Sequence, residues 1–179
     1  METRELSKEK LAELQEEIAP LAQAFDLVDD HVVITDPDAR IIYANYAVQE
    51  NTGYSSSEVI GKNPAELWGG NMPKEFYEKM WTTIKTEKRP FVGEVKNKRK
   101  DGTEYWQEVR IYPIFGQYGD IKIFIGMEPN ITTRKTAEGE AKRKFEEIDK
   151  MNKFMIDREL KMVELKKEIE TLKSQLSRK

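Results

Sequence analysis

Hydrophobic residues near the start of the chain recur at steps of three and four, which is the spacing of one face of an α-helix. The members of this stripe are Leu11, Leu14, Ile18, Leu21, Phe25 and Val28. Ser7 is placed to cap the helix, and Pro20, which has no backbone N–H to donate, should divide it. The pattern predicts an amphipathic cap helix within residues 1–29, with one piece near 8–19 and a second near 21–28.

The next hundred residues carry short β-type segments separated by turn residues. Two predicted strands flank Asp36-Pro37-Asp38, and three longer ones form a meander whose first turn is Asp101-Gly102. Short helices and one longer helix, from Pro73 to about Lys85, fill the space between these two sets. The predicted strands cover residues 31–34, 40–43, 91–98, 103–114 and 121–127. This order indicates an α+β fold with an antiparallel sheet of five strands.

The last third of the chain has a second and longer helical stripe, with no proline and only Gly139 after about residue 133. The stripe keeps a heptad spacing for about four heptads, which predicts a dimeric coiled coil over 133–179. A parallel homodimer keeps the two preceding domains at one end. The seam consists of Ile148, Met151, Met155, Arg158, Met162, Leu165, Ile169, Leu172 and Leu176.

Arg158 places a charge inside this otherwise apolar seam, and a charged core position weakens a coiled coil locally. A second helical alignment that includes Phe145 competes with the first one there. Two interpretations stay open, a seam that switches between two packings and a plain structural stalk with one charged layer.

Composition narrows the function classes. The 179 residues carry a formal net charge of -3 and no cysteine, which argues against a nucleic-acid-binding protein and excludes disulfides and thiolate chemistry. No apolar run approaches the roughly 20 residues that span a bilayer, and no signal-peptide core is present. We find no metal-ligand cluster, nucleotide loop or phosphoacceptor histidine box. The expectation is a cytoplasmic protein without catalytic residues, metal site, nucleic-acid partner or membrane segment.

Short motifs in the middle of the chain resemble those of the PAS domain family. The similar segments are Ile34-Thr35-Asp36, Ile42-Tyr43-Ala44-Asn45, Thr52-Gly53-Tyr54, Glu58 to Asn63, Arg99 to Thr103, Phe124-Ile125-Gly126 and Asn130-Ile131-Thr132. The resemblance implies a PAS domain over 30–132, with short helices on one face of a five-stranded antiparallel sheet. It also implies that Asn130, Ile131 and Thr132 pass a signal to the C-terminal helix, as in bacterial sensor kinases. Asn130 stands where the family usually has Asp, and the Asp's salt bridge is therefore lost.

The flavin-binding light sensors of this family have a cysteine that forms the photoadduct, and Pro64 stands at its place here. Ala65 replaces the phosphate-binding arginine and Trp68 a glutamine. Asn97 matches a flavin-contacting asparagine, whereas Gln107 and Glu128 occupy the places of two other amide residues. The resemblance therefore implies that flavin is not bound.

Haem is not expected either. Haem-binding members of the family use a histidine on the longer helix, and residues 73–85 contain none. His31, the only histidine of the chain, lies at the start of the first predicted strand and is interpreted as structural.

Strand alternation places apolar and polar residues of the last three strands on one face of the sheet, where they line a ligand pocket or fill a core, and Asn63 joins them as a pocket candidate from outside the strands. This candidate set is Asn63, Val95, Asn97, Gln107, Val109, Ile111, Phe124 and Glu128. The opposite face carries Trp106, Tyr112, Ile114, Ile121, Ile123, Ile125 and Met127. Such an apolar face needs a cover, for which residues 21–28 of the same chain or of a partner are the candidate.

Two functions of different class compete at this point. The first is a sensor and dimerisation module that couples a PAS domain, with or without a small ligand, to an output domain elsewhere. The second is a constitutive dimerisation scaffold whose PAS domain binds only protein.

Overall fold

The computed structural model describes residues 8–177 of the chain. The chain divides into two compact units, and the boundary along the sequence falls between Thr133 and Arg134. Ser7 lies outside the described residues, so its predicted role as a helix cap stays a prediction.

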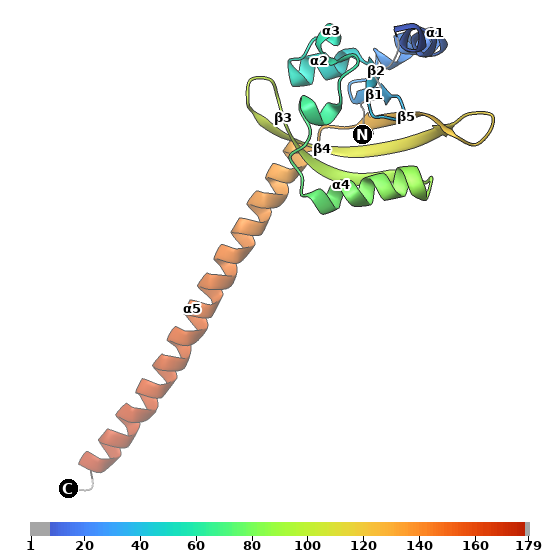
Figure 1. Cartoon of the computed structure of the whole chain (residues 1–179). Coiled ribbons are helices and arrows are strands. Elements are labelled where there is room, and N and C mark those ends of the chain that lie inside the picture. Colours follow the sequence, from blue (N-terminus) through green and yellow to red (C-terminus); the bar gives the residue numbers. More distant parts are fainter. Residues whose placement is uncertain (1–7, 178–179) are drawn as a thin grey trace. The chain divides into compact units, whose positions relative to one another are not determined.

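The first unit alternates strands and helices in the order that the sequence predicts. Its elements are α1 (Lys8–Phe25), β1 (His31–Thr35), β2 (Ile41–Ala44), α2 (Tyr46–Thr52), α3 (Ser56–Val59), η1 (Pro64–Glu66), α4 (Lys74–Trp81), η2 (Thr82–Thr86), β3 (Phe91–Lys98), β4 (Glu104–Phe115) and β5 (Ile121–Glu128). The long helix α5 (Thr132–Leu176) follows directly. The predicted α+β class and the five-stranded antiparallel sheet are confirmed (Figure 1).

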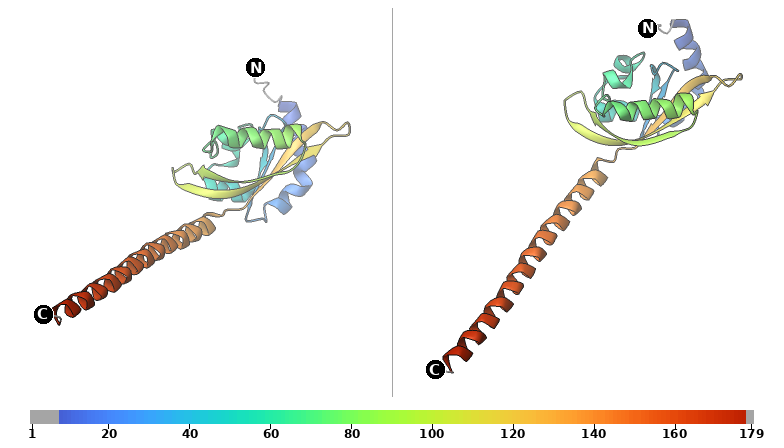
Figure 2. Two further views of the ribbon diagram at one scale, coloured as in Figure 1. Left: turned by 90° about the horizontal axis from the view of Figure 1, so that it is seen from below. Right: turned by 60° about the horizontal axis from the view of Figure 1, so that its bottom comes forward.

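The five strands are ordered β2-β1-β5-β4-β3, and each pairs antiparallel with its neighbours. The last strand therefore inserts between β1 and β4, in the centre of the sheet. Helices α4 and α1 lie on opposite faces (Figure 2). The face toward α4 is called the inner face below, and the face toward α1 the outer face.

Apolar side chains on both faces of the sheet form the core. On the inner face, Met80 and Ile84 of the helical layer pack against Val95, Val109 and Phe124. A second inner cluster closes around the side chain of Trp68, which is 2% exposed. The outer face is covered only in part, because Tyr112, Ile114 and Met127 on the β4 side of that face are 36–43% exposed.

Helix α1 covers the outer face over β1, β2 and part of β5, but not in the way that the sequence predicts. The helix runs without a break through Pro20 to Phe25. Leu14 and Ile18 are buried against Ile34 and the neighbouring strands, and that packing on the sheet is what offsets the hydrogen bond lost at Pro20.

The predicted cover, residues 21–28, is therefore wrong in its details. Leu21 is 55% exposed and Leu27 is 87% exposed, because the helix ends at Phe25 and the chain then leaves the stripe. Phe25 is the residue of the predicted cover that does pack on the outer face. It belongs to the same cluster as Leu11, Leu14 and Ile18 of α1.

The outer set of the last strand is also corrected at one residue. Ile123 and Ile125 pack under α1, but Ile121 packs with the inner cluster. The reason is a β-bulge, since Ile114 pairs with Ile123 whereas Phe115 pairs with Ile121. Lys122 is the extra residue, and a bulge reverses the alternation of the residues beyond it. Lys122 instead forms an ion pair with Glu17 of α1, at 2.6 Å.

Asn45, directly after β2, joins the end of α1 to strand β1. Its side-chain oxygen accepts a hydrogen bond from Val32 N at 2.9 Å, and its side-chain nitrogen donates to the carbonyls of Phe25, Val28 and Asp30. The Asp36 carboxylate closes the first hairpin by accepting from Arg40 N at 2.7 Å. These contacts fix α1 and β1, and through them one wall of the interior.

The second unit consists of the rest of α5, a helix of 45 residues in all. Every described side chain from residue 140 onward is exposed, including the predicted seam from Ile148 to Leu172. The side chain of Leu176 lies outside the described part of the chain. Among residues 8–177, no helix combines the length and the apolar character that crossing a membrane requires.

Candidate ligand pocket

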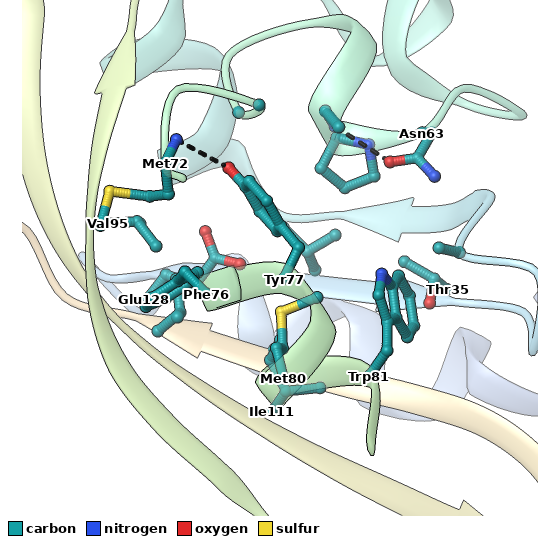
Figure 3. Close-up of a pocket in the computed structure, with 18 of the residues that line it drawn as sticks. Thr35, Asn63, Met72, Phe76, Tyr77, Met80, Trp81, Val95, Ile111 and Glu128 are labelled. Carbon is teal, nitrogen blue, oxygen red and sulfur yellow. Dashed lines mark hydrogen bonds between the residues drawn. The ribbon is translucent and has the colours of Figure 1, made fainter. Parts of the chain in front are cut away.

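A cavity of about 510 Å³ lies between the inner face of the sheet and the helical layer (Figure 3). This volume falls in the range of small-molecule sites. Strands β3, β4 and β5 form its floor through Val95, Val109 and Phe124. A glycine keeps part of the floor open, because a Cβ at Gly126 would come within 3.1 Å of a carboxyl oxygen of Glu128.

Helix α4 and the loop before it form the opposite wall. The ring of Phe76 meets the ring of Phe91 edge to face at 5.5 Å, and Trp81 meets Phe124 in the same way at 6.1 Å. Tyr77 accepts a hydrogen bond from Met72 N at 3.3 Å, which holds the start of α4 to the loop. The helix continues into a π-helical turn at Thr82–Thr86, and Ile84 of that turn is buried against the cavity.

A chain of amide hydrogen bonds forms the polar end of the domain interior. Asn97 donates to the side-chain oxygen of Gln107 at 2.7 Å. The side-chain nitrogen of Gln107 donates to the backbone carbonyl of Glu128 at 2.9 Å and lies 2.7 Å from His31 Nδ1. The carbonyl can only accept, which fixes the orientation of the amide. Nδ1 of His31 is therefore the acceptor, and the proton of the neutral ring is on Nε2.

The His31 ring is neutral at physiological pH. It is 1% exposed, and burial, followed by the charge of Arg99, lowers the pKa of His31 to about 4. A buried cationic ring would have no compensating carboxylate in contact, because the nearest oxygen of Glu128 lies 3.9 Å from Nδ1.

Glu128 is the acidic group of the pocket. Its side chain is turned to the interior and the residue is 9% exposed, and burial raises the pKa of Glu128 to about 7. Its Oε2 has no hydrogen-bond partner among the described residues. Close to neutral pH this carboxyl therefore exists in both protonation states.

The structure places seven of the eight candidate residues on the cavity wall: Asn63, Val95, Asn97, Val109, Ile111, Phe124 and Glu128. Gln107 is not on the wall. It is 0% exposed and lies behind the wall, where it joins Asn97 to Glu128. Asn63 also has a local role, because its side-chain oxygen accepts from Ala65 N at 3.0 Å and caps the 3-10 turn η1.

Sequence reasoning missed the helical wall and the role of His31. The wall residues Met72, Phe76, Tyr77, Met80, Trp81 and Ile84 come from a segment interpreted only as a helix. Their spacing at three and four residues was a usable signal, since one face of that helix is apolar. His31 gave no signal, because its neighbours in the cluster come from strands far along the sequence.

The segment after Glu128 connects the pocket wall to α5. Ile131 N donates to the carbonyl of Trp106 at 2.8 Å, and Trp106 N donates to the Thr132 hydroxyl at 2.9 Å. The backbone of Asn130 forms an isolated antiparallel β-bridge with Gln107. Its side-chain oxygen accepts a hydrogen bond from Thr132 N at 2.9 Å. The amide of Asn130 thus caps the first turn of the helix, a role that does not need the charge of the family's usual Asp.

The comparisons with known proteins agree with this geometry. A family model described as PAS domain matches residues 29–133, which is more than half of the chain. The chain belongs to the PAS domain family.

Several curated relatives are regulators or photoreceptors. The nitrogen fixation regulatory protein of Klebsiella oxytoca is 34% identical over 107 residues, which cover 60% of this chain and 21% of that protein. The blue-light photoreceptor of Listeria monocytogenes serovar 1/2a is 32% identical over 135 residues, 74% of this chain and 53% of that protein. The blue-light-activated histidine kinase 1 of Erythrobacter litoralis is 35% identical over 96 residues, 54% of this chain and 26% of that protein. The chain thus spans between a fifth and about a half of the length of these relatives.

Solved structures give the same fold. The PAS domain of a protein from Colwellia psychrerythraea superimposes with a TM-score of 0.57 at 27% identity, over 65% of this chain and 98% of that chain. An RNA-binding light-oxygen-voltage receptor superimposes with a TM-score of 0.61 at 23% identity, over 71% of this chain and 37% of that chain, which shows a shared fold.

The described residues offer neither a metal-ligand cluster nor a cysteine for a photoadduct. Among the described residues, no group of three or more His, Asp or Glu side chains could hold a metal ion. Pro64 and Ala65 lie on the pocket wall where the light sensors need cysteine and arginine, so a cysteinyl photoadduct cannot form.

Proposed function

We propose that this chain is the regulatory module of a signalling protein, in which a PAS domain detects a small molecule and passes the signal to an output domain through a parallel coiled coil formed by α5. The observation that carries the proposal is the position of Glu128, which lies on the pocket wall four residues before the start of α5 at Thr132.

Coupling follows from the connections of the last strand. A ligand that displaces Glu128 or Asn97 also shifts Gln107, because the Gln107 side chain is hydrogen-bonded to both residues. Gln107 in turn forms a β-bridge with Asn130. Ile131 and Thr132 are tied to Trp106 on the neighbouring strand, so a shift of β5 against β4 moves the first turn of the helix. Transmission of this kind needs a second element with two arrangements of similar free energy. The seam near Arg158 is the proposed one.

The chain itself supplies no catalysis in this proposal, and the output domain is on another segment or another chain. The name of the Erythrobacter litoralis relative, a histidine kinase, supports a kinase output. Homodimerisation in the cytoplasm completes the proposal. The pocket is proposed to take neither flavin nor haem, so a freshly purified sample should show no flavin or Soret absorption band.

The test is a fusion of residues 1–179 to a histidine kinase output domain, with phosphorylation as the readout. Val95→Phe fills the cavity from β3, because Val95 is buried and lines the wall. Val92→Phe, on the same strand, is the matched control, since Val92 is 60% exposed and is absent from the wall. We expect Val95→Phe to change kinase activity at least threefold and Val92→Phe to leave it unchanged.

A constitutive scaffold predicts a different result. Both variants would then leave kinase activity at the level of the parent, provided that circular dichroism shows both to be folded. Native mass spectrometry of the parent would complement this test, because it reports the number of chains and the mass of any retained small molecule together.

A further inference from the structure

The carboxyl group of Glu128 is the only acidic side chain on the pocket wall within the described residues. Figure 3 shows it pointing into the space between Val95, Phe76 and Tyr77. The absence of a side chain at Gly126 leaves room for it, since a Cβ there would lie 3.1 Å from Oε1. The second oxygen, Oε2, is buried and has no hydrogen-bond partner among the described residues. An unpartnered buried carboxyl oxygen costs free energy, and such a group calls for an occupant that satisfies it.

None of the titratable groups around this carboxyl supplies a compensating positive charge. From β1, His31 faces it at 3.9 Å as a neutral ring whose lone pair already accepts from Gln107. From β4, Tyr105 is a buried phenol, and burial raises the pKa of Tyr105 above its usual value. Arg99 stacks on the ring of Tyr105 at 4.5 Å and donates to the carbonyl of Asn51. From α4, Lys74 lies at the pocket rim and pairs with Glu78 at 3.3 Å.

Most of the remaining wall is apolar and rich in aromatic rings, with Thr35, Asn63, Asn97 and Lys74 as its other polar members. Phe76, Tyr77 and Trp81 face the cavity from the helical layer, and Phe124 faces it from the sheet. Aromatic faces attract cations through the ring quadrupole, more strongly where water is excluded. The same rings also suit a flat apolar body.

We propose that the pocket binds a compact aromatic or apolar amine, whose protonated nitrogen pairs with the Glu128 carboxylate while its apolar body packs between α4 and the sheet. This inference rests on the proposed sensory function and adds the chemical class of the ligand. A neutral alcohol or amide would satisfy Oε2 with one hydrogen bond, but it would leave the charge of the ionised carboxyl uncompensated. An anionic ligand would place a second negative charge next to it.

Binding of an ammonium group requires the ionised form of Glu128, so affinity depends on pH. Because the pKa of Glu128 is about 7, most of the carboxyl is ionised at pH 8 and most is protonated at pH 6. His31 keeps one state over this range, since its pKa is about 4. An amine that stays protonated throughout should therefore bind about tenfold more weakly at pH 6 than at pH 8, whereas a neutral analogue should not.

The experiment compares three indole probes of similar size by isothermal titration calorimetry on the full chain. Tryptamine carries the amine, tryptophol replaces it with a hydroxyl group, and indole-3-acetate carries a negative charge. At pH 8 we expect tryptamine to bind at least tenfold tighter than tryptophol and indole-3-acetate to bind least. Glu128→Gln should reduce the preference for tryptamine over tryptophol to about one, with tryptophol affinity retained.

Glu104→Gln is the matched control, because Glu104 is an exposed glutamate of the same sheet, paired with Lys96 and absent from the pocket wall. It should behave like the parent chain. If tryptophol binds the parent as tightly as tryptamine, or if Glu128→Gln keeps the preference for tryptamine, the pocket stands but the amine assignment is overturned. If none of the three probes binds the parent, the amine assignment is likewise overturned, whereas the proposed sensory function is refuted only by a kinase fusion that does not respond to Val95→Phe.

Discussion

The two units of the chain treat their apolar residues in opposite ways. In the PAS unit, large side chains are enclosed by their own chain, as with Ile34 at 1% exposed and Trp68 at 2% exposed. In α5 the apolar residues of the seam remain open, from Leu165 at 43% exposed to Met151 at 65% exposed. The first unit thus completes its own core. The second presents a stripe with nothing inside its own unit to cover it.

This difference teaches where the stability of each unit must come from. A sheet with one face under the helical layer and part of the other under α1 gains free energy from burial within one chain. A helix of 45 residues is about 70 Å long, and most helical stability in proteins comes from packing an apolar face against a partner. The heptad spacing of the seam matches another helix of the same kind, which is the basis for the predicted homodimer.

The largest expected effect comes from placing charges in the seam. Replacing Leu165 and Leu172 together with Lys should weaken the dimer at least a thousandfold, because two apolar core positions become like charges that face their counterparts. Sedimentation equilibrium at micromolar concentration should then show a monomer. Circular dichroism should show a loss of helix from α5.

The control for the double Lys variant introduces two lysines into α5 at positions outside the seam. Val163 and Glu170 are both exposed and are not seam residues, so replacing them with Lys should leave the dimer intact. A monomeric parent chain would refute the predicted homodimer, and it would remove the contrast between the two units as a guide to assembly.

The second effect is pH-dependent and belongs to the PAS unit. Burial raises the pKa of Glu128 from 4.5 to about 7, so its stabilising effect is complete below pH 4.5 and is lost as pH rises through 7. Burial lowers the pKa of His31 from 6.5 to about 4, so its stabilising effect is complete above pH 6.5 and is lost as pH falls through 4. Each shift corresponds to roughly 3 kcal/mol. Between about pH 4.5 and 6.5 the two slopes oppose each other.

Single substitutions should separate these slopes. The stability of Glu128→Gln should rise with pH between 4 and 6.5, since only His31 remains. The stability of His31→Gln should fall between 4.5 and 7, since only Glu128 remains. Urea unfolding followed by tryptophan fluorescence measures both, because all three tryptophans lie in the PAS unit. Parallel pH profiles for the parent and both variants would show that neither group is perturbed by the fold.

A third prediction compares two leucines of α1. Leu14→Ala should destabilise the PAS unit by about 2 to 3 kcal/mol, because Leu14 is buried between α1 and the sheet and is only 4% exposed. Leu21→Ala should change stability by less than about 0.5 kcal/mol, because Leu21 is 55% exposed. Urea unfolding of each variant provides the measurement. Equal effects would mean that Leu21 is covered in solution by a surface such as a second copy of the chain.

Strand alternation was a sound guide to the pocket floor. Asn97, Val109 and Glu128 lie on one face, as predicted, because β3, β4 and β5 pair in regular register beside them. The same rule was wrong for Ile121, because a bulge is a property of two paired strands and leaves no mark on one of them. Alternation therefore works locally, up to the first irregularity in the pairing.

Features that depend on distant segments could not be obtained from the sequence. Pro20 signals a break, yet the packing of Leu14 and Ile18 on the sheet keeps α1 whole. His31 meets Gln107, 76 residues along the chain, and a single histidine at a strand start gives no hint of that neighbour. The position of α4 over the cavity likewise depends on the tertiary packing of Phe76 and Trp81 on the sheet.

The smallest expected effect tests how α5 transmits a signal, rather than whether it pairs. Arg158 is the one charged member of the seam, and its replacement by Leu removes a weak layer. We expect Arg158→Leu to raise the melting temperature of the dimer by a few degrees, which corresponds to about 1 kcal/mol. Lys150→Leu, an exposed change outside the seam, is the matched control and should leave melting unchanged.

The consequence for signalling follows from the same layer. If the charge keeps two seam packings close in free energy, then Arg158→Leu favours one of them and fixes the output. In the kinase fusion, Val95→Phe should change the activity of the parent but no longer change it in the Arg158→Leu background. Arg158→Lys should keep the response, because it retains the charge. If Val95→Phe acts equally in both backgrounds, α5 is a rigid stalk and the signal reaches the output without a switch in the seam.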